Sequence, residues 1–463
     1  MQGTRVKKTA YLGWAIGSFT SSALVSAVGL LHLRFMTDSL GLAIGLAGML
    51  TVLAKIYDAA CDPLMGHIGD RTHTRFGKYR PYLLGGGLMA GLSMVMLFNV
   101  PAALSGTGLW VWVGMTLLFF STAYTLFRIP YLALGRAITS NFQERSKLMT
   151  FSVYGSSLGN MAATAAAPFL LSRIGSDRAG HGMVAIVLGV LIALGGAASF
   201  ALLREGEAAE SAPSGDGSLR EAVGALRRNR PFLCLIGFKL VLFSGLTVHM
   251  AAIPFYTRHV LGVADSTLGS IFLVQTLAMM GSQYLWVRLA ARHGRRNALL
   301  GASALCALAY FSWLFVPAAR PEPFVHLCAL VSGIATGGIF LGLYTVLTDT
   351  MDYSRQVQGD SRAGMLAGVF VMVEKGTAAF GTFVFSMTMA WVGFVSSTGN
   401  GADAQPPSVR LGIIVALSVV PSLAAVAAGL IMLRYRLPGQ AAPEHAAQAS
   451  ETAEGNALNA TAA

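Results

Sequence analysis

The feature that most constrains this chain is a series of apolar segments, each long enough to cross a lipid bilayer as a helix. Spanning the hydrocarbon takes about 20 mostly apolar residues, and twelve segments of this kind follow one another along the 463-residue chain. Charged residues make up 12 % of the sequence, against roughly 25 % in an ordinary soluble domain. The sequence therefore predicts an all-α membrane protein with twelve transmembrane helices.

The expected helices divide six plus six around the longest polar interruption. The first six lie near 11–35, 41–66, 82–101, 109–135, 149–172 and 182–203, and the second six near 231–257, 267–290, 298–317, 324–350, 364–392 and 409–433. The predicted organisation is a six-helix half at 1–203, a central loop at 204–230, a second six-helix half at 231–436 and a tail at 437–463. The tail is too poor in apolar side chains to fold, so we expect it to be disordered.

The loop charges predict the orientation. Most Lys and Arg residues between the spans fall on the side of the two termini, and the opposite side holds only Arg173, Arg178, Arg258, Arg320 and Arg410. By the positive-inside rule both termini, the central loop and the tail are expected to be cytoplasmic. The excess of 33 Lys and Arg over 21 Asp and Glu orients loops in such a chain, so no nucleic-acid partner is predicted.

The two halves carry similar loops after their second helices. Residues 75–80 read Arg-Phe-Gly-Lys-Tyr-Arg, and residues 292–296 read Arg-His-Gly-Arg-Arg. Paired six-helix halves with a site between them are typical of secondary transporters. Charges on this side are expected to form contacts that close a cytoplasmic gate, although they can equally be plain orientation signals. These charges are Asp70, Arg71, Arg75, Lys78, Arg80, Arg145, Arg295 and Arg296.

Two carboxylates lie where the second helix crosses the membrane. Asp58 and Asp62 are four residues apart and share one helix face. An ionisable residue inside a span costs about 2.5 to 3.5 kcal/mol and marks a functional candidate. The repulsion between two such carboxylates is relieved by a bound cation or a proton. The pair therefore predicts a coupling site for sodium or a proton; the alternative is a structural ion network with Lys55.

Two basic residues add to this picture. Arg128 lies deep in the fourth span, two residues before Pro130, and needs either an acidic partner or an anionic ligand. Asp58 and Asp62 are the candidate acidic partners. In the eleventh span Glu374 and Lys375 point about 100° apart, so they do not simply pair. Lys375 is the better candidate to reach the two carboxylates from the other half.

Motifs for other chemistry are lacking in the sequence. There is no G-x-x-x-x-G-K-[ST], H-E-x-x-H or G-x-S-x-G pattern and no zinc-ligand spacing. We therefore expect neither an enzyme nor a cofactor beyond the coupling ion.

One long motif resembles a known family. Residues 58–82 read DAACDPLMGHIGDRTHTRFGKYRPY, and related elements are Ile129-Pro130-Tyr131, Glu144-Arg145, Asp349-Thr-Met-Asp352-Tyr353 and Lys375. Together they are similar to the glycoside-pentoside-hexuronide:cation symporters, the family of the melibiose permease within the major facilitator superfamily. The resemblance implies a major facilitator fold that rocks between inward-open and outward-open states while a cation, sodium or a proton, is coupled to the solute.

The resemblance also implies site residues. Asp58 and Asp62 match the carboxylates that bind the coupling cation, Thr125 matches their hydroxyl neighbour, and Lys375 matches the associated lysine. The residues at the expected solute site differ from those of the melibiose permease, which has acidic, arginine and tryptophan residues at the corresponding positions. The residues expected to bind solute here are Phe19, Tyr124, Arg128, Leu132 and Val153.

Arg128 decides which solute we expect. Apolar side chains cannot accept hydrogen bonds from sugar hydroxyls, whereas an arginine favours carboxylate, sulfonate or phosphate. The sequence thus predicts a monomeric bacterial inner-membrane symporter, embedded in lipid, for a small solute that is glycoside-like or an organic anion such as a uronide. An exporter or a carrier of lipid-like solutes with the same fold remains open, as does a membrane sensor that no longer transports.

Overall fold

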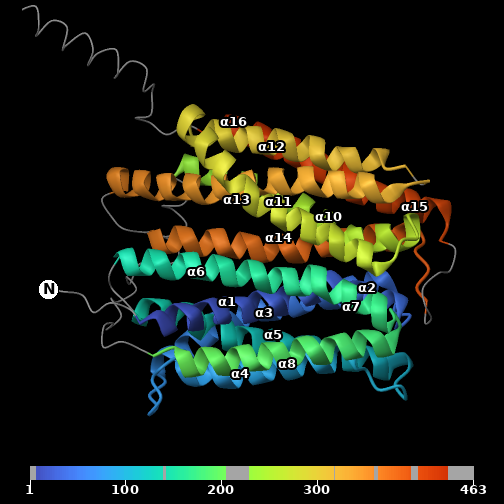
Figure 1. Ribbon diagram of the computed structural model, residues 1–463, viewed down its shortest axis with the longest axis horizontal. Coiled ribbons are helices and arrows are strands. Elements are labelled where there is room, and N and C mark those ends of the chain that lie inside the picture. Colours follow the sequence, from blue (N-terminus) through green and yellow to red (C-terminus); the bar gives the residue numbers. More distant parts are fainter. Residues whose placement is uncertain are drawn as a thin grey trace, which may run out of the picture.

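The computed structural model describes residues 7–138, 142–204, 229–317, 319–358, 363–397 and 405–435, and nearly all of them are helical (Figure 1). These ranges contain no strand. The N-terminal helices are α1 (Lys8–Ala27), η1 (Val28–His32), α2 (Leu33–Asp38), α3 (Ile44–Arg71), α4 (Arg80–Phe98), α5 (Gly106–Ile138), α6 (Phe142–Met161), η2 (Ala162–Ala166), α7 (Ala167–Ile174) and α8 (Arg178–Leu202). The C-terminal helices are α10 (Arg230–Phe255), η3 (Tyr256–Val260), α11 (Asp265–His293), α12 (Arg295–Phe311), η4 (Ser312–Phe315), α13 (Pro321–Gln358), α14 (Ala363–Trp391), α15 (Pro407–Ile414), η5 (Val415–Val419) and α16 (Val420–Leu433).

Several of these helices join end to end through one short π-helical or 3-10 segment. In this way α1, η1 and α2 form one rod, and the described residues form twelve rods in all. Ten of these rods are long and apolar enough to cross a membrane. The other two, α6–η2–α7 and α11, are more polar, and they contact each other. Polar side chains on a spanning helix are cheaper against another helix than against lipid. The predicted twelve-helix, all-α membrane fold is confirmed.

The rods form two bundles. Figure 1 shows α1 to α8 in the lower part of the view and α10 to α16 in the upper part, with the rods side by side. Between the bundles, α3 packs on α14 and α7 packs on α11. The central loop and the tail, predicted at 204–230 and 437–463, fall almost wholly outside the described residues. The exact division of the chain therefore stays a prediction.

Some helices are longer than the apolar segments predict. Helix α3 continues to Arg71, so Asp70 and Arg71 lie in its last turn and not in a loop as expected. Helix α13 likewise runs to Gln358, beyond the expected end near residue 350. A helix that leaves the hydrocarbon no longer needs apolar side chains, so composition does not mark where it stops.

Glycines let the rods approach backbone to backbone. A Cβ on Gly87 of α4 would lie 2.6 Å from the Cα of Gly196 on α8, and one on Gly155 of α6 would lie 2.0 Å from the carbonyl oxygen of Ala15 on α1. Small residues at helix interfaces permit such close packing in membranes. These contacts fix the N-terminal bundle in which α3 and α5 carry the candidate site.

The rods begin and end at two opposite ends of the molecule. The basic end is where Lys8, Arg71, Arg80 and Arg295 begin or end their helices. The contact end is the opposite one, where Asp38 ends α2 and Asp265 begins α11.

Candidate functional site

Asp58 and Asp62 lie together on α3, facing α5. The Thr125 hydroxyl on α5 lies 2.9 Å from Asp58 Oδ1 and 3.1 Å from Asp62 Oδ1, and its one proton can go to either. The i, i+4 spacing of the aspartates puts both on one face of α3, as the sequence predicts. Thr125 thus links two helices of the N-terminal bundle through a pair of carboxylates.

Lys375 reaches this pair from the other bundle. Its Nζ, on α14, donates to Asp58 Oδ2 at 3.3 Å and also to Asp62. The side chains of Asp58, Asp62 and Lys375 are 2 %, 21 % and 27 % exposed, so one carboxylate is buried and the other borders solvent-accessible space. The alternative network with Lys55 is wrong for the described residues, where the ion-pair partner of Asp58 is Lys375.

This group of side chains suits a small monovalent cation or a proton. It offers two carboxylates and one hydroxyl, the oxygen ligands that hard cations prefer. The described residues hold no cluster of three or more His, Cys, Asp or Glu, which separates this group from sites for transition metals. The ammonium of Lys375 lies where such a cation would balance both carboxylates.

Arg128 has no carboxylate partner among the described side chains. Its Nη1 donates to the Ser21 hydroxyl of α1 at 3.1 Å, and the expected alternative pairing with Asp58 or Asp62 does not occur. Helix α5 runs unbroken through Pro130, so this arginine sits within a continuous helix. A half-buried guanidinium held by one neutral hydroxyl retains donors for an anionic ligand.

The other residues expected to bind solute are less clustered. The Tyr124 ring, one turn before Arg128, lies 5.9 Å from the Lys375 ammonium and is half-buried. Phe19 is half-buried on α1, whereas Leu132 and Val153 are 49 % and 64 % exposed. The structure therefore brings Tyr124 next to the candidate cation site and records no contact of Leu132 or Val153 with it.

A second ion pair near this site escaped the sequence reasoning. Lys239 of α10, with a side chain only 1 % exposed, donates to Glu374 Oε2 on α14 at 2.8 Å and to the Phe370 carbonyl at 2.9 Å. The sequence signal was present, since both residues are charged within spans, but their pairing depends on how α10 packs on α14.

The expected gating residues make their recorded contacts within their own bundles. Arg80 donates to the Phe200 carbonyl of α8 at 2.8 Å, Arg295 pairs with Asp349 of α13, and Arg296 donates to the Leu433 carbonyl at 2.5 Å. Arg75 and Lys78 lie over the rings of Phe76 and Tyr79, their chain neighbours. Arg71 is exposed, and the side chains of Asp70 and Arg145 lie outside the described part.

At the contact end, by contrast, charged residues join the two bundles. Arg34 of α2 donates to Asp265 of α11 at 2.5 Å and 3.3 Å, and Asp38 lies 3.0 Å from His259 of η3. The Ser397 amide donates to the Thr37 carbonyl at 3.0 Å. The sequence analysis missed these pairs, although Arg34 and Asp38 stand four residues apart in an apolar span. The bundles are thus tied at the contact end and meet, further along, at Lys375.

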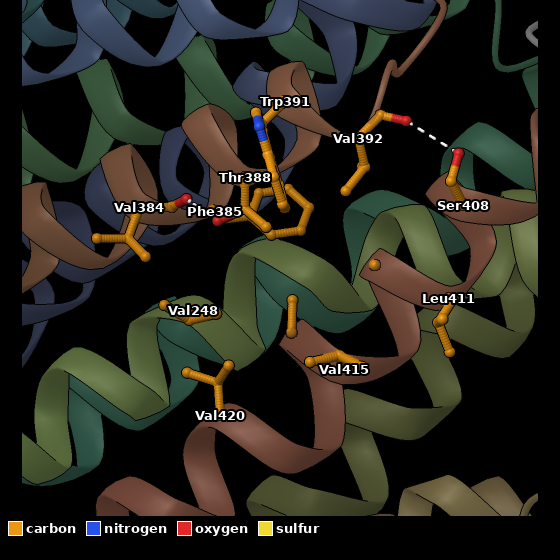
Figure 2. Close-up of a pocket in the computed structure, with 12 residues that line it drawn as sticks. Val248, Val384, Phe385, Thr388, Trp391, Val392, Ser408, Leu411, Val415 and Val420 are labelled. Atoms are coloured by element: carbon orange, nitrogen blue, oxygen red, sulfur yellow. Dashed lines mark hydrogen bonds between the residues drawn. The ribbon is translucent and has the colours of Figure 1, made fainter.

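A separate apolar cavity of about 330 Å³ lies within the C-terminal bundle (Figure 2). Val248 of α10, Phe385 and Trp391 of α14, and Val415 of η5 are among its lining residues. It holds no ionised side chain, and so it is not part of the site formed by Asp58 and its neighbours.

Comparisons with known proteins identify the family of the chain. A family model described as MFS/sugar transport protein matches residues 13–439. The inner membrane symporter YicJ of Escherichia coli (strain K12) is 27 % identical over 440 residues, which cover 92 % of this chain and 90 % of that protein. The glucuronide carrier protein homolog of the same organism is 26 % identical over 421 residues, covering 89 % of this chain and 88 % of that protein.

A solved structure shares the fold. The crystal structure of a bacterial homolog of the human lysosomal transporter Spinster, in an inward-facing and unoccupied conformation, matches with a TM-score of 0.66 at 14 % identity. The match covers 93 % of this chain and 98 % of that one. At this identity the likeness concerns the fold alone, and it agrees with the fold expected from the sequence.

Proposed function

Because the chain belongs to the family of MFS/sugar transport proteins, we propose that it is a symporter that couples sodium or a proton to the import of a hydroxylated organic anion such as a uronide. Like its relatives, the chain is a multi-pass membrane transporter, and it is not an enzyme.

The observation that carries the proposal is the meeting of Asp58, Asp62, Thr125 and Lys375 between the bundles. A cation or proton held by these carboxylates would screen their repulsion and free Lys375. Occupancy would then draw α3 and α5 together and order the neighbouring part of α5, which carries Tyr124 and Arg128. If the cation raises solute affinity in this way, the solute must raise cation affinity by the same factor.

Arg128 supports an anionic solute. Its recorded partner is the neutral Ser21 hydroxyl, so a carboxylate or sulfonate of the solute would supply the missing counter-charge. A relative is named a glucuronide carrier protein homolog, which fits a uronide. The role of Phe19, Leu132 and Val153 in this proposal is limited to the apolar boundary of the solute space.

The orientation follows from the charges. The basic end would face the cytoplasm, together with both termini, in a bacterial inner membrane. The ties at the contact end, through Arg34, Asp38 and Asp265, then close the outer side. We accordingly assign the structure to an inward-facing state of a transporter that works as a monomer.

Binding measured by thermal stability tests the proposal. Methyl glucuronide should raise the melting temperature of the detergent-purified protein, and sodium or a lower pH should enlarge that rise, because ligands that bind only the folded state stabilise it by mass action. Methyl glucoside, its neutral analogue, should cause a much smaller shift. A shift with methyl glucoside alone would indicate that the protein transports neutral sugars and that Arg128 has only a structural role.

Arg128→Gln provides the matched variant. Hydrogen bonds to charged groups contribute about 1.5 to 3 kcal/mol, so we expect methyl glucuronide affinity to fall at least about tenfold. The melting temperature without solute should change little, because the recorded bond of Arg128 is to one neutral hydroxyl. Undiminished affinity for methyl glucuronide would contradict the assignment of Arg128.

A further inference from the structure

The Lys239–Glu374 pair is asymmetric in its exposure. The Lys239 side chain is 1 % exposed, whereas that of Glu374 is 45 % exposed. The contacts of the lysine are all internal: Glu374 Oε2 at 2.8 Å, the Phe370 carbonyl at 2.9 Å, and the ring centroids of Phe370 at 3.3 Å and Phe243 at 5.3 Å. Lys239 thus binds one carboxylate oxygen of Glu374 from the protein interior, while the rest of the Glu374 carboxylate stays accessible.

Burying a lysine in this way is expensive and calls for an explanation. Charges inside spans are rare and mark functional positions by default, and a buried ion pair is weak support for stability, since apolar residues of similar volume often serve as well. The effect of Lys239 on Glu374 is more specific than a general gain in stability. A carboxylate held by one ammonium is fixed in position, with lone pairs left to accept further hydrogen bonds.

Glu374 also lies near the solute anchor of the other bundle. It directly precedes Lys375, whose ammonium lies 5.9 Å from the Tyr124 ring, and Tyr124 is one turn from Arg128 on α5. The phenol of Tyr344 on α13 lies within electrostatic range of both Arg128 and Glu374. Tyr344 therefore lies near opposite charges from the two bundles.

The Tyr344 ring adds an aromatic face near Glu374. It is 51 % exposed and packs against Phe370, at 5.7 Å between ring centroids, and Phe370 in turn covers the Lys239 ammonium. A partly exposed aromatic ring beside a fixed carboxylate offers an apolar face next to hydrogen-bond acceptors, which suits the faces and hydroxyls of a sugar ring.

We propose that Glu374 is a solute-binding residue, positioned by Lys239, which accepts hydrogen bonds from the hydroxyls of an organic anion whose charged group is bound by Arg128. This inference rests on the proposed function and deepens it, because it specifies that the site recognises the hydroxyls of the solute as well as its anionic group. The ligand class is a polyhydroxylated monoanion. Such a solute would bridge α5 of one bundle and α14 of the other, and would favour closure around itself.

Two probes with the same charge test the proposal. Methyl glucuronide carries a carboxylate and ring hydroxyls, while cyclohexanecarboxylate carries the carboxylate on a ring without hydroxyls. In Glu374→Gln the affinity for methyl glucuronide should fall about tenfold, since bonds to an ionised acceptor are about twice as strong as neutral ones. The affinity for cyclohexanecarboxylate should not fall. The readout is the ratio of the two affinities, which a loss of stability alone would not move.

Two further variants keep the test decisive. Glu374→Gln leaves Lys239 buried beside a neutral amide, so Lys239→Met/Glu374→Gln removes the uncompensated charge and should show the same lost selectivity in a stable protein. Glu322→Gln, at the start of α13 near the contact end, is the control and should keep the wild-type ratio.

The outcomes separate this inference from the proposed function. If the wild-type protein binds both anions and Glu374→Gln leaves their ratio unchanged, the inference is wrong and the proposed function stands. An equal loss for both probes also overturns it, because Glu374 would then act on the whole site. If the wild-type protein binds neither anion, the anionic solute itself is wrong, and the inference falls with it.

Discussion

At the scale of single residues, Lys375 is the group whose position says most about coupling. Its ammonium contacts both Asp58 and Asp62, so in this state the protein supplies its own cation to the pair. In the proposed function a coupling ion would have to displace that ammonium, and the displaced Lys375 would then be free to move with α14. Binding of the ion would in this way be connected to the relative position of the two bundles.

Replacing this lysine should make the protein depend on added cation. In Lys375→Met the two carboxylates lose their counter-charge, and breaking a buried pair in this way costs about 3 to 5 kcal/mol. We expect a lower melting temperature in sodium-free buffer and a larger rise on addition of sodium than in the wild type. Lys147→Met is the control, because that lysine is 61 % exposed and forms only a surface pair with Glu144. Equal sodium shifts in all three proteins would contradict the role of Lys375.

The residues that the sequence predicted well are those whose spacing along one helix carries the information. Asp58 and Asp62 share a face because they are four residues apart, and that face could be identified from the sequence alone. The pairs Lys239 with Glu374 and Arg34 with Asp265 join helices distant in the chain. Which buried charges meet is decided by the packing of those helices, and no local pattern records it.

At the scale of helices, length and composition predicted the number of spans but not their ends. The apolar segments gave twelve helices because each must match the hydrocarbon thickness. Helix α3 nevertheless continues to Arg71, and α11, expected near 267–290, is more polar than the ten apolar rods and packs against α7. The roles of Leu132 and Val153 were carried over from a resemblance by position, and both are largely exposed.

The three consecutive glycines of α4 offer a test of helix packing. A Cβ on Gly87 would lie 2.6 Å from Gly196 of α8, whereas a Cβ on Gly85 would meet nothing within 4 Å. We expect Gly87→Ala to destabilise the protein by about 1 to 3 kcal/mol through overpacking, and Gly85→Ala to leave the melting temperature unchanged or slightly higher. Similar melting temperatures for the two variants would mean that α4 and α8 are not packed this closely.

At the scale of the whole molecule, the ties between the bundles are distributed unevenly. The charged contacts between bundles at the contact end include Arg34 with Asp265 and Asp38 with His259. The recorded contacts of Arg80, Arg295 and Arg296 at the basic end stay within one bundle. An alternating transporter needs both ends to close in turn, so the inter-bundle pairs at the contact end would have to break for this end, the proposed outer side, to open.

Breaking one of these pairs should shift the protein toward its outward-open state. Asp265→Asn removes the acidic partner of Arg34 in the other bundle and leaves Asp38, at 3.8 Å on the same helix. The Arg34 side chain is only 2 % exposed, so the change raises the free energy of the state in which the bundles pair here. Each 1.4 kcal/mol changes a population ratio tenfold. Ser397→Cys reports the change, because the Ser397 hydroxyl donates to the Asp38 carbonyl at 3.3 Å across the same contact. In intact cells, a membrane-impermeant maleimide should label this cysteine at least about tenfold faster in the Asp265→Asn background.

The control for this experiment is chosen at the same end of the molecule. Glu322→Gln also neutralises a carboxylate there, but Glu322 accepts from Thr267, at 3.4 Å, within the C-terminal bundle. It should leave the labelling rate of the cysteine unchanged, since no tie between the bundles is lost. If Asp265→Asn labels no faster than this control, the Arg34–Asp265 pair does not hold the outer side closed. Faster labelling in Asp265→Asn alone, slowed again by methyl glucuronide, would mean that the solute favours a state in which the contact end is closed, because a ligand shifts an equilibrium only by its differential affinity for the two states.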